Sequence, residues 1–143
     1  MKVKVKRLYS DAILPTYATD GSACFDIYTM LNGDTDYGVP HTYSTGLAFE
    51  IPEDHVMLVF SRSGHGFKND VRLSNCVGVI DSDYRGELKV KLACDKEGWG
   101  LEINAGDRIA QGMILPVNKV VFEEVEELSN TERGNKGFGS TGK

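Results

Sequence analysis

The residues best suited to chemistry gather in one short polar stretch, Asp81-Ser82-Asp83-Tyr84-Arg85, which holds two carboxylates, a phenol and a guanidinium. Apolar residues precede this stretch and an alternating run follows it, so it is predicted to join two strands at a polar corner. Asp-Ser-Asp is ordinary turn chemistry, because short polar side chains bond to their own backbone. Asp81 directly follows three apolar residues, so it is expected at the edge of buried surface, where a carboxylate is either paired or retained for chemistry. The stretch is therefore either a polar hairpin turn or a catalytic corner.

A second candidate site follows Arg62. Residues Ser63–Asn69 are predicted to form a turn or two of helix, the only helical segment expected in the chain. Unpaired backbone N–H groups at a helix start can bind a phosphate. A plain polar loop is the alternative. Arg85 and Arg133 are further candidates for holding a small anion.

The elements that must position these residues are short strands. Alternating or β-branched runs are broken by turn residues throughout, and no long stretch has helical periodicity. Such a pattern predicts an all-β sandwich or barrel. The strands are expected at residues 3–8, 23–29, 42–51, 55–60, 71–80, 87–94, 101–104, 108–117 and 120–125.

The composition changes after Leu128. Residues 129–143 contain no aliphatic side chain and are predicted to form a mobile tail beyond a domain of residues 1–128. Phe138 stands alone among glycines and hydroxyls, which suits a tail that folds over a flat aromatic ligand and holds an anion nearby. Residues 137–143 also spell a phosphate-binding P-loop string, but the helix that aims its dipole at the phosphates is missing from the sequence, so this interpretation is rejected.

Composition excludes several other classes. The net charge of −5 and pI of about 5.2 argue against a nonspecific nucleic-acid binder. Runs of about 18 apolar residues are absent, so no membrane span is expected. Widely spaced cysteines and histidines form neither a disulfide framework nor a local metal cluster, and free or buried thiols in a reducing compartment are expected. These residues are Cys24, Cys76, Cys94, His41, His55 and His65.

Five segments in order resemble the trimeric dUTP pyrophosphatases (dUTPases), and together they cover nearly the whole chain. They are Gly21-Ser22-Ala23-Cys24-Phe25-Asp26, Arg62-Ser63-Gly64, residues 78–87, Gly106-Asp107-Arg108-Ile109-Ala110-Gln111 and the tail from Arg133. The resemblance implies a jelly-roll-like β-sandwich with one short helix, assembled as a homotrimer whose active sites are shared between subunits. It also implies Mg²⁺-dependent hydrolysis of dUTP to dUMP and pyrophosphate in the cytoplasm, or in the nucleus or an organelle of a eukaryote. That reaction would keep uracil out of DNA and supply dUMP for thymidylate synthesis.

In this resemblance, Asp81 is the general base that deprotonates the attacking water, and Gln111 lies near the α-phosphate. Tyr84 packs against the deoxyribose and leaves no room for a ribose 2′-OH. Asp26 contacts the magnesium only through water. The remaining substrate contacts are Asn75, Val79, Ile80 and Lys89 for the uracil edge, Arg62, Ser63 and Gly64 for phosphate oxygens, and Arg133, Phe138, Gly139, Ser140 and Thr141 in the tail.

The sequence departs from the family pattern at Cys24-Phe25, at Ser61 and in the less apolar start of His65-Gly66-Phe67. These departures concern loop shape and remove no functional group. Two alternatives remain: a dCTP deaminase, which shares the fold, and a nucleotide-sensing module that binds a regulatory protein through residues 32–40. The deaminase needs a group that protonates the cytosine ring, for which the sequence has no signature, and the tail from Arg133 to Gly142 belongs to the pyrophosphatase pattern. The joint presence of Asp81, Gln111 and Arg133 disfavours the sensing module, which would not need all three.

Overall fold

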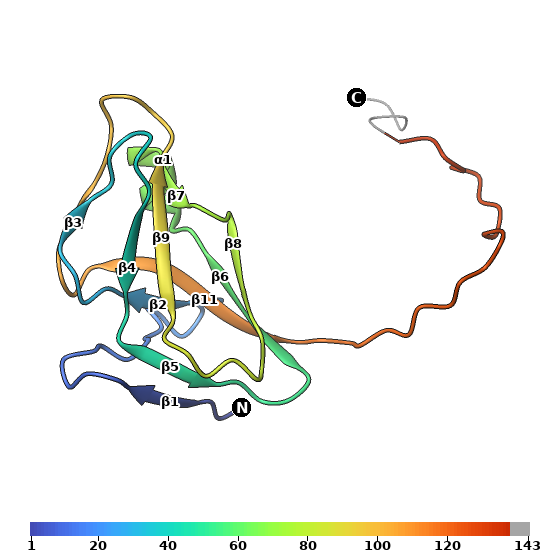
Figure 1. The fold of residues 1–143 in the computed structure, drawn as a ribbon, viewed down its shortest axis with the longest axis horizontal. Helices are drawn as coiled ribbons and strands as arrows, with labels where there is room; N and C mark the ends of the chain where they lie inside the picture. Colours follow the sequence, from blue (N-terminus) through green and yellow to red (C-terminus); the bar gives the residue numbers. More distant parts are fainter. Residues whose placement is uncertain (138–143) are drawn as a thin grey trace.

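The computed structural model describes residues 1–137 and forms strands with one short helix (Figure 1). The prediction of an all-β sandwich with a single helix is confirmed. The elements are β1 (Lys4–Arg7), β2 (Phe25–Tyr28), β3 (Gly33–Asp34), β4 (His41–Ser44), β5 (Leu47–Glu50), β6 (His55–Phe60), α1 (Ser63–Asn69), β7 (Val71–Leu73), β8 (Val77–Ile80), β9 (Lys89–Cys94), β10 (Glu102–Ile103) and β11 (Arg108–Pro116).

Two antiparallel sheets form the body of the molecule. One has the order β2-β11-β6-β8 and the other the order β4-β9-β7, while β1 pairs with β5 and β10 with β3. The nine-residue strand β11 lies at the centre of the first sheet, between β2 and β6. Strand β8 is an edge strand, because β6 is its only strand partner in the sheet.

The inward faces of the two sheets share one hydrophobic core. On β9, Val90 and Leu92 are buried while Lys89 and Lys91 face solvent, which is the alternation expected of a strand with one wet face. Met57 and Val59 of β6 belong to the same cluster of buried side chains as these β9 residues. The two sheets are therefore packed face to face, and the ends of their strands are fixed relative to one another.

Two predicted strands are each divided in the structure. Residues 42–51 break at Gly46, which has φ +69°, so the chain turns from β4 into β5. A Cβ added there would lie 2.8 Å from the Cβ of Ala12, so the site needs glycine for both space and backbone angle. Residues 71–80 break between β7 and β8 at a turn in which Cys76 has φ +64°. Alternation continues across both turns, which is why the sequence pattern missed them.

The predicted strand at residues 120–125 is wrong. No strand forms over these residues, and the segment from residue 120 to 137 leads away from the body (Figure 1). Val121 and Phe122 are 97% and 92% exposed. A strand requires a partner, and within one chain this segment has none among the described strands. The structure also has the short strand β3, where the sequence predicted only a turn.

Helix α1 has the predicted bounds, Ser63–Asn69. Arg62 is its N-cap residue, and Asp70 ends it in the left-handed conformation, with its N–H donating to the carbonyls of Gly66 and His65. The three cysteines are free thiols, as expected. Among residues 1–137, no helix has the length and apolar character needed to cross a membrane.

Candidate active site

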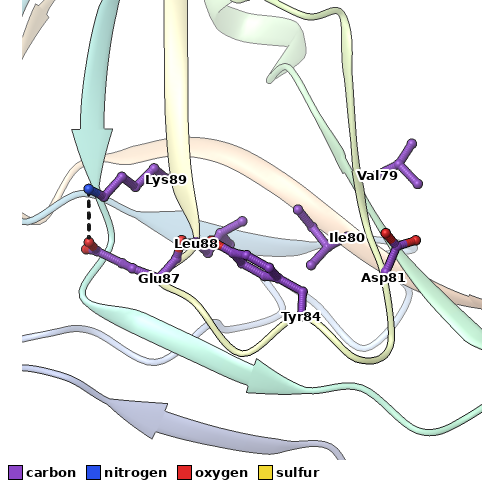
Figure 2. Close-up of a pocket in the computed structure, with 7 residues that line it drawn as sticks. All are labelled: Val79, Ile80, Asp81, Tyr84, Glu87, Leu88 and Lys89. Atoms are coloured by element: carbon purple, nitrogen blue, oxygen red, sulfur yellow. Dashed lines mark hydrogen bonds and ion pairs between the residues drawn. The ribbon is translucent and has the colours of Figure 1, made fainter.

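The polar corner predicted from the sequence joins two strands that belong to different sheets. Strand β8 pairs with β6, with Ile80 opposite Met57, whereas β9 pairs with β4 and β7. Because β8 and β9, the two arms of this corner, diverge, no strand among residues 1–137 uses the outer backbone edge of β8. A pocket of about 440 Å³ lies between the arms, lined by Val79, Ile80, Asp81, Tyr84, Glu87, Leu88 and Lys89 (Figure 2). An unpaired strand edge offers backbone donors and acceptors to a flat polar ligand.

Asp81 is more exposed than the sequence suggested. The expectation that it lies at the edge of buried surface is wrong for the single chain, since both Asp81 and Val79 are exposed. Among residues 1–137, the Asp81 carboxylate has no ion pair and no side-chain hydrogen bond. Both of its oxygens are therefore available to accept a hydrogen bond from a water or a ligand.

Tyr84 lies across the pocket towards Glu87 and Leu88 (Figure 2). Its phenol donates to the backbone carbonyl of Glu87 at 3.1 Å. Its ring rests on Gly86: a Cβ at that position would lie 2.6 Å from the ring Cζ of Tyr84. Arg85 donates to the carbonyls of Ser82 at 2.6 Å and Tyr84 at 3.0 Å, so it closes the turn and is committed there.

Residues 87–89, which lead from the polar corner into β9 and are called the return arm below, are bonded to the corner between β4 and β5. The buried N–H of Gly46 donates to Oε1 of Glu87 at 2.9 Å, and Lys89 Nζ lies 3.6 Å from Oε2 of the same carboxylate. The buried hydroxyl of Thr45 donates to the Leu88 carbonyl at 2.6 Å. These bonds hold residues 87–89 in place from the side opposite Asp81 (Figure 2).

A second polar cluster forms around Asp26, at the other end of the same sheet. Arg108 Nη1 lies 3.2 Å from Asp26 Oδ2, and Arg62 Nε lies 3.7 Å from Asp26 Oδ1. Arg62 also donates to the Arg108 carbonyl at 3.1 Å. The Asp26 side chain is only 14% exposed and thus has both guanidinium groups close to it. The cluster carries two positive charges against one negative charge, which suits an anionic ligand.

His65 is the third partner of Arg62. Its Nε2 lies 3.2 Å from Arg62 Nη1. A guanidinium can only donate, so Nε2 is the acceptor and the imidazole is neutral with its proton on Nδ1. Burial, followed by the charge of Arg62, lowers the pKa of His65 below its ordinary value of 6.5. The neutral imidazole is therefore the form that orients Arg62.

The remaining predicted phosphate contacts surround this cluster. Ser63 lines a shallow pocket with Arg62, and Gly64 is in the first turn of α1. Gln111 of β11 lies opposite Asp26 in the sheet and donates through Nε2 to the Ser61 carbonyl at 2.9 Å. The predicted residues Asp26, Arg62, Ser63, Gly64 and Gln111 thus gather at one end of the sheet.

The two clusters lie at opposite ends of β6. Asp81 follows the β8 residue that pairs with Met57, whereas Arg62 lies two residues beyond the other end of β6. Asp81 therefore lies level with Val56, six residues before Arg62, and at about 3.3 Å per residue the separation along the strand is roughly 20 Å. Asn75 is in the turn before β8 and so lies at the Arg62 end of that strand, outside the pocket around Tyr84. One chain does not bring all the predicted site residues together.

The predicted tail contacts are only partly described. Arg133 is exposed and donates through Nε to the Lys136 carbonyl at 3.0 Å in a local turn. Phe138, Gly139, Ser140 and Thr141 lie outside the described residues.

The donor atoms present determine what metal the site can hold. Within residues 1–137, no group of three or more His, Cys, Asp or Glu is placed to bind a metal ion. Mg²⁺ keeps several waters and is commonly held by one or two carboxylates together with ligand phosphates. Asp26, a carboxylate inside the cationic cluster, fits a Mg²⁺ that arrives on a phosphate-bearing ligand.

Sequence reasoning missed Gly86, Glu87 and Arg108 as members of the two sites. Gly86 and Glu87 fall inside the best-matched segment, but their functions depend on contacts with Tyr84 and Gly46 that no spacing rule predicts. Arg108 starts a predicted strand and belongs to the fourth matched segment, but the sequence assigns it no role, and its proximity to Asp26 follows from the pairing of β2 with β11.

Comparison with known proteins gives a consistent result. A family model described as dUTPase matches residues 10–142. The deoxyuridine 5′-triphosphate nucleotidohydrolase of Nautilia profundicola is 45% identical over 143 residues, covering 100% of both chains. The solved structure of Staphylococcus bacteriophage 80alpha dUTPase with dUPNHPP has a TM-score of 0.90 at 28% identity, covering 99% of this chain and 98% of that one. A mutant dUTPase of phage phi11 of S. aureus, described with a structural Mg(II) ion, shares the fold at TM-score 0.80 and 24% identity, over 89% of this chain and 98% of that one.

Proposed function

This chain belongs to the dUTPase family and is a dUTP diphosphatase, and we propose that it cleaves dUTP by attack of an Asp81-activated water on the α-phosphorus. The observation that carries the proposal is the pocket between β8 and β9, which places an unpartnered carboxylate beside Tyr84 and a free strand edge. The water forms a bond to the α-phosphorus and loses one proton to Asp81. The bond from the α-phosphorus to the bridging oxygen breaks, giving dUMP and pyrophosphate.

The nucleoside is held by the arms of the pocket. Backbone groups of Val79, Ile80 and Lys89 read the uracil edge, and Asn75, in the turn that precedes β8, reads it from beyond the lining of the pocket. Tyr84 covers the deoxyribose, and its phenol is fixed by the Glu87 carbonyl. Selection of this kind is steep, because a wrong base leaves buried polar groups unpaired.

The triphosphate is held by the cationic cluster. Arg62, Ser63 and Gly64 bind phosphate oxygens, and Gln111 lies near the α-phosphate and the attacking water. Arg133 binds the γ-phosphate when the tail closes, with Phe138 over the uracil and Gly139, Ser140 and Thr141 beside the phosphates. Mg²⁺ bound to the triphosphate would neutralise phosphate charge, with Asp26 contacting it through water. Positioning and charge stabilisation supply most of the rate enhancement in phosphoryl chemistry.

The active site is completed between copies of the chain. Asp81 and Arg62 are separated by roughly the length of β6, so a nucleotide seated by one Tyr84 reaches the phosphate cluster of a neighbouring chain more readily than that of its own. A closed ring of three identical chains satisfies this arrangement for every site. We therefore propose a homotrimer with shared active sites.

The segment from residue 120 to 128 supports this assembly. Val121, Phe122 and Leu128 are 97%, 92% and 86% exposed in the single chain, and water is an unfavourable environment for such a run. Its four glutamates, Glu123, Glu124, Glu126 and Glu127, complement the basic first strand of the chain, which contains Lys4, Lys6 and Arg7. Among the described strands, β1 pairs with β5 alone, so its other edge is unpaired there, beside an apolar pocket that Val3 and Val5 help to line. A second copy of β1 is thus a suitable partner for the segment.

The cellular role follows from the reaction. Hydrolysis of dUTP keeps uracil out of DNA and supplies dUMP for thymidylate synthesis. The free thiols suit a reducing compartment, so we place the enzyme in the cytoplasm.

The test is turnover of dUTP, UTP, dTTP and dCTP by the wild-type chain and by Asp81→Asn, measured as pyrophosphate release. Wild type should hydrolyse dUTP far faster than the other three nucleotides. Asp81→Asn should still bind dUTP but lose turnover by about 10²–10⁴-fold, because an amide cannot accept the proton. Undiminished turnover in this variant excludes Asp81 as the base, and ammonia released from dCTP would indicate a deaminase instead.

A further inference from the structure

We propose that Glu87 is a positioning residue for sugar selectivity: it holds the return arm of the pocket against the Gly46 corner and so sets the place of the Tyr84 ring. The proposal rests on the function proposed above, in which Tyr84 contacts the deoxyribose.

A free carboxylate beside a site for an anionic nucleotide would weaken binding, because like charges repel. Both oxygens of Glu87 are occupied. Oε1 accepts from the Gly46 N–H at 2.9 Å, and Oε2 lies 3.6 Å from Lys89 Nζ. The side chain is only 16% exposed. Glu87 therefore faces its own chain and does not present a free charge to the ligand.

The direction of the side chain assigns the role. The side chains of Glu87 and Lys89 both point away from Asp81 (Figure 2). Glu87 lines the pocket, but its carboxylate is turned towards the Gly46 N–H and Lys89 Nζ. This geometry is that of a side chain that acts by positioning its neighbours.

The Gly46 N–H explains why a long side chain with a terminal oxygen acceptor is needed at residue 87. Gly46 is buried, and a buried backbone donor without a partner is costly. The positive φ that turns the chain at Gly46 brings two neighbouring groups into bonds with the next residue of the arm: Thr45 Oγ1 donates to the Leu88 carbonyl at 2.6 Å, and the Leu88 N–H donates to the Leu47 carbonyl at 2.8 Å. Glu87 Oε1 supplies the remaining bond between the arm and this corner.

The arm in turn sets Tyr84. The backbone carbonyl of Glu87 accepts the phenol of Tyr84 at 3.1 Å, so the residue held by Gly46 is also the residue that anchors the ring. When the Glu87 side chain is shortened, its backbone is released from the corner at this position. The Tyr84 ring then loses a fixed place, and room for a ribose 2′-OH opens.

The test compares kcat/KM for dUTP and UTP in wild type, Glu87→Gln, Glu87→Asp and Glu87→Ala. Glu50→Gln is the matched control, because Glu50 is a carboxylate paired with Lys4 at 2.7 Å, away from the pocket. We expect Glu87→Ala and Glu87→Asp to lower the dUTP/UTP ratio about tenfold, since aspartate is one methylene too short to reach Gly46. Glu87→Gln should keep most of the ratio, because its amide oxygen still accepts from the Gly46 N–H. Glu50→Gln should match wild type.

The outcomes distinguish failure of the Glu87 inference from failure of the proposed function on which it rests. A wild-type ratio in Glu87→Asp overturns the positioning role, whether or not Glu87→Ala folds. An equal loss in Glu87→Gln and Glu87→Asp also overturns it, since the Gly46 bond would then be irrelevant. If Tyr84→Ala keeps the wild-type ratio, the sugar contact in the proposed function fails, and the Glu87 inference fails with it. If Tyr84→Ala lowers the ratio while the Glu87 variants do not, only the Glu87 inference fails.

Discussion

Gly86 provides the sharpest test of how the pocket selects its sugar. A methyl group at this position would lie 2.6 Å from Cζ and 3.0 Å from Cε2 of Tyr84, whereas ordinary contacts between such atoms begin near 3.4 Å. In Gly86→Ala the ring must therefore move by about 1 Å. The ring is 46% exposed, so it can move without disturbing the core. The cost to folding is then mainly the hydrogen bond from Tyr84 to the Glu87 carbonyl, about 1 kcal/mol.

The cost to selectivity should be larger than the cost to stability. A misplacement of about 1 Å in a positioned group can reduce a rate by about 10²-fold. We expect Gly86→Ala to lower kcat/KM for dUTP by 10–100-fold and the dUTP/UTP ratio by at least about tenfold. Steady-state kinetics with both nucleotides measure the ratio, and urea unfolding measures the stability.

The control for this experiment is Gly21→Ala, because an added methyl there meets no atom within 4 Å. Gly21→Ala should leave the ratio unchanged. An unchanged ratio in Gly86→Ala, with fold and stability retained, would show that the position of Tyr84 does not determine sugar selection.

Three further predictions concern other parts of the molecule. The pKa of His65 is lowered in the folded chain, so below about pH 6.5 the unfolded chain binds a proton that the folded chain does not. The free energy of unfolding therefore falls as the pH drops towards the pKa of the folded state. In urea unfolding between pH 7.5 and 5, His65→Gln should flatten this dependence on pH, whereas His55→Gln should keep it. Deleting residues 133–143 should leave a trimer in sedimentation with strongly reduced turnover, whereas deleting residues 120–143 should also break the assembly; a normal trimer from the shorter chain would exclude the segment from the interface. Gly112→Ala places a methyl 2.7 Å from Cε2 of Phe25 in the core and should cost about 1–3 kcal/mol in urea unfolding; a change under about 0.5 kcal/mol would show that Phe25 yields freely.

The sequence predicted the fold class well because strand alternation reports burial directly. The run from Lys89 to Leu92 alternates in the sequence and alternates in exposure in the structure. Helix α1 was predicted with its exact bounds from a short run of small and polar residues after Arg62. In these cases the determining interactions are local, or depend only on which face of an element is buried.

Features that depend on distant partners were predicted less well. Residues 120–125 have the alternation and β-branching of a strand, but a strand needs an edge to pair with, and the single chain supplies none to this segment. The exposure of Asp81 was missed for a related reason. Apolar Val79 beside it suggested burial, yet Val79 is 61% exposed on an edge strand. The sequence pattern cannot distinguish burial within a chain from burial between chains.

The sequence names the candidate residues, and the resemblance implies sites shared between subunits, but the distance between the two groups of residues comes only from the structure. Asp81 and Tyr84 share the pocket of β8 and β9, while Arg62, Asp26 and Gln111 gather at the far end of the same sheet. Linear order places Arg62 and Asp81 in neighbouring motifs. Only the register of β6 with β8 shows that one strand length lies between them.

The divergence of β8 and β9 links the enzyme's choice of substrate to its interior. Each arm of the pocket extends from a different sheet, so the width of the mouth is set by the thickness of the layer of side chains between those sheets. Val59 of β6 pairs with Gly78 of the β8 arm and points into this layer, where a Cβ on Gly78 would lie 3.2 Å from the Val59 Cβ, and Val90 of the β9 arm belongs to the same core. In the proposed function, substitutions that thin or thicken this layer are therefore expected to change which sugars fit, even though none of the altered side chains reaches the nucleotide. Variants of this enzyme with altered fidelity are then to be sought among the residues that fill its centre as well as among those that line its pocket.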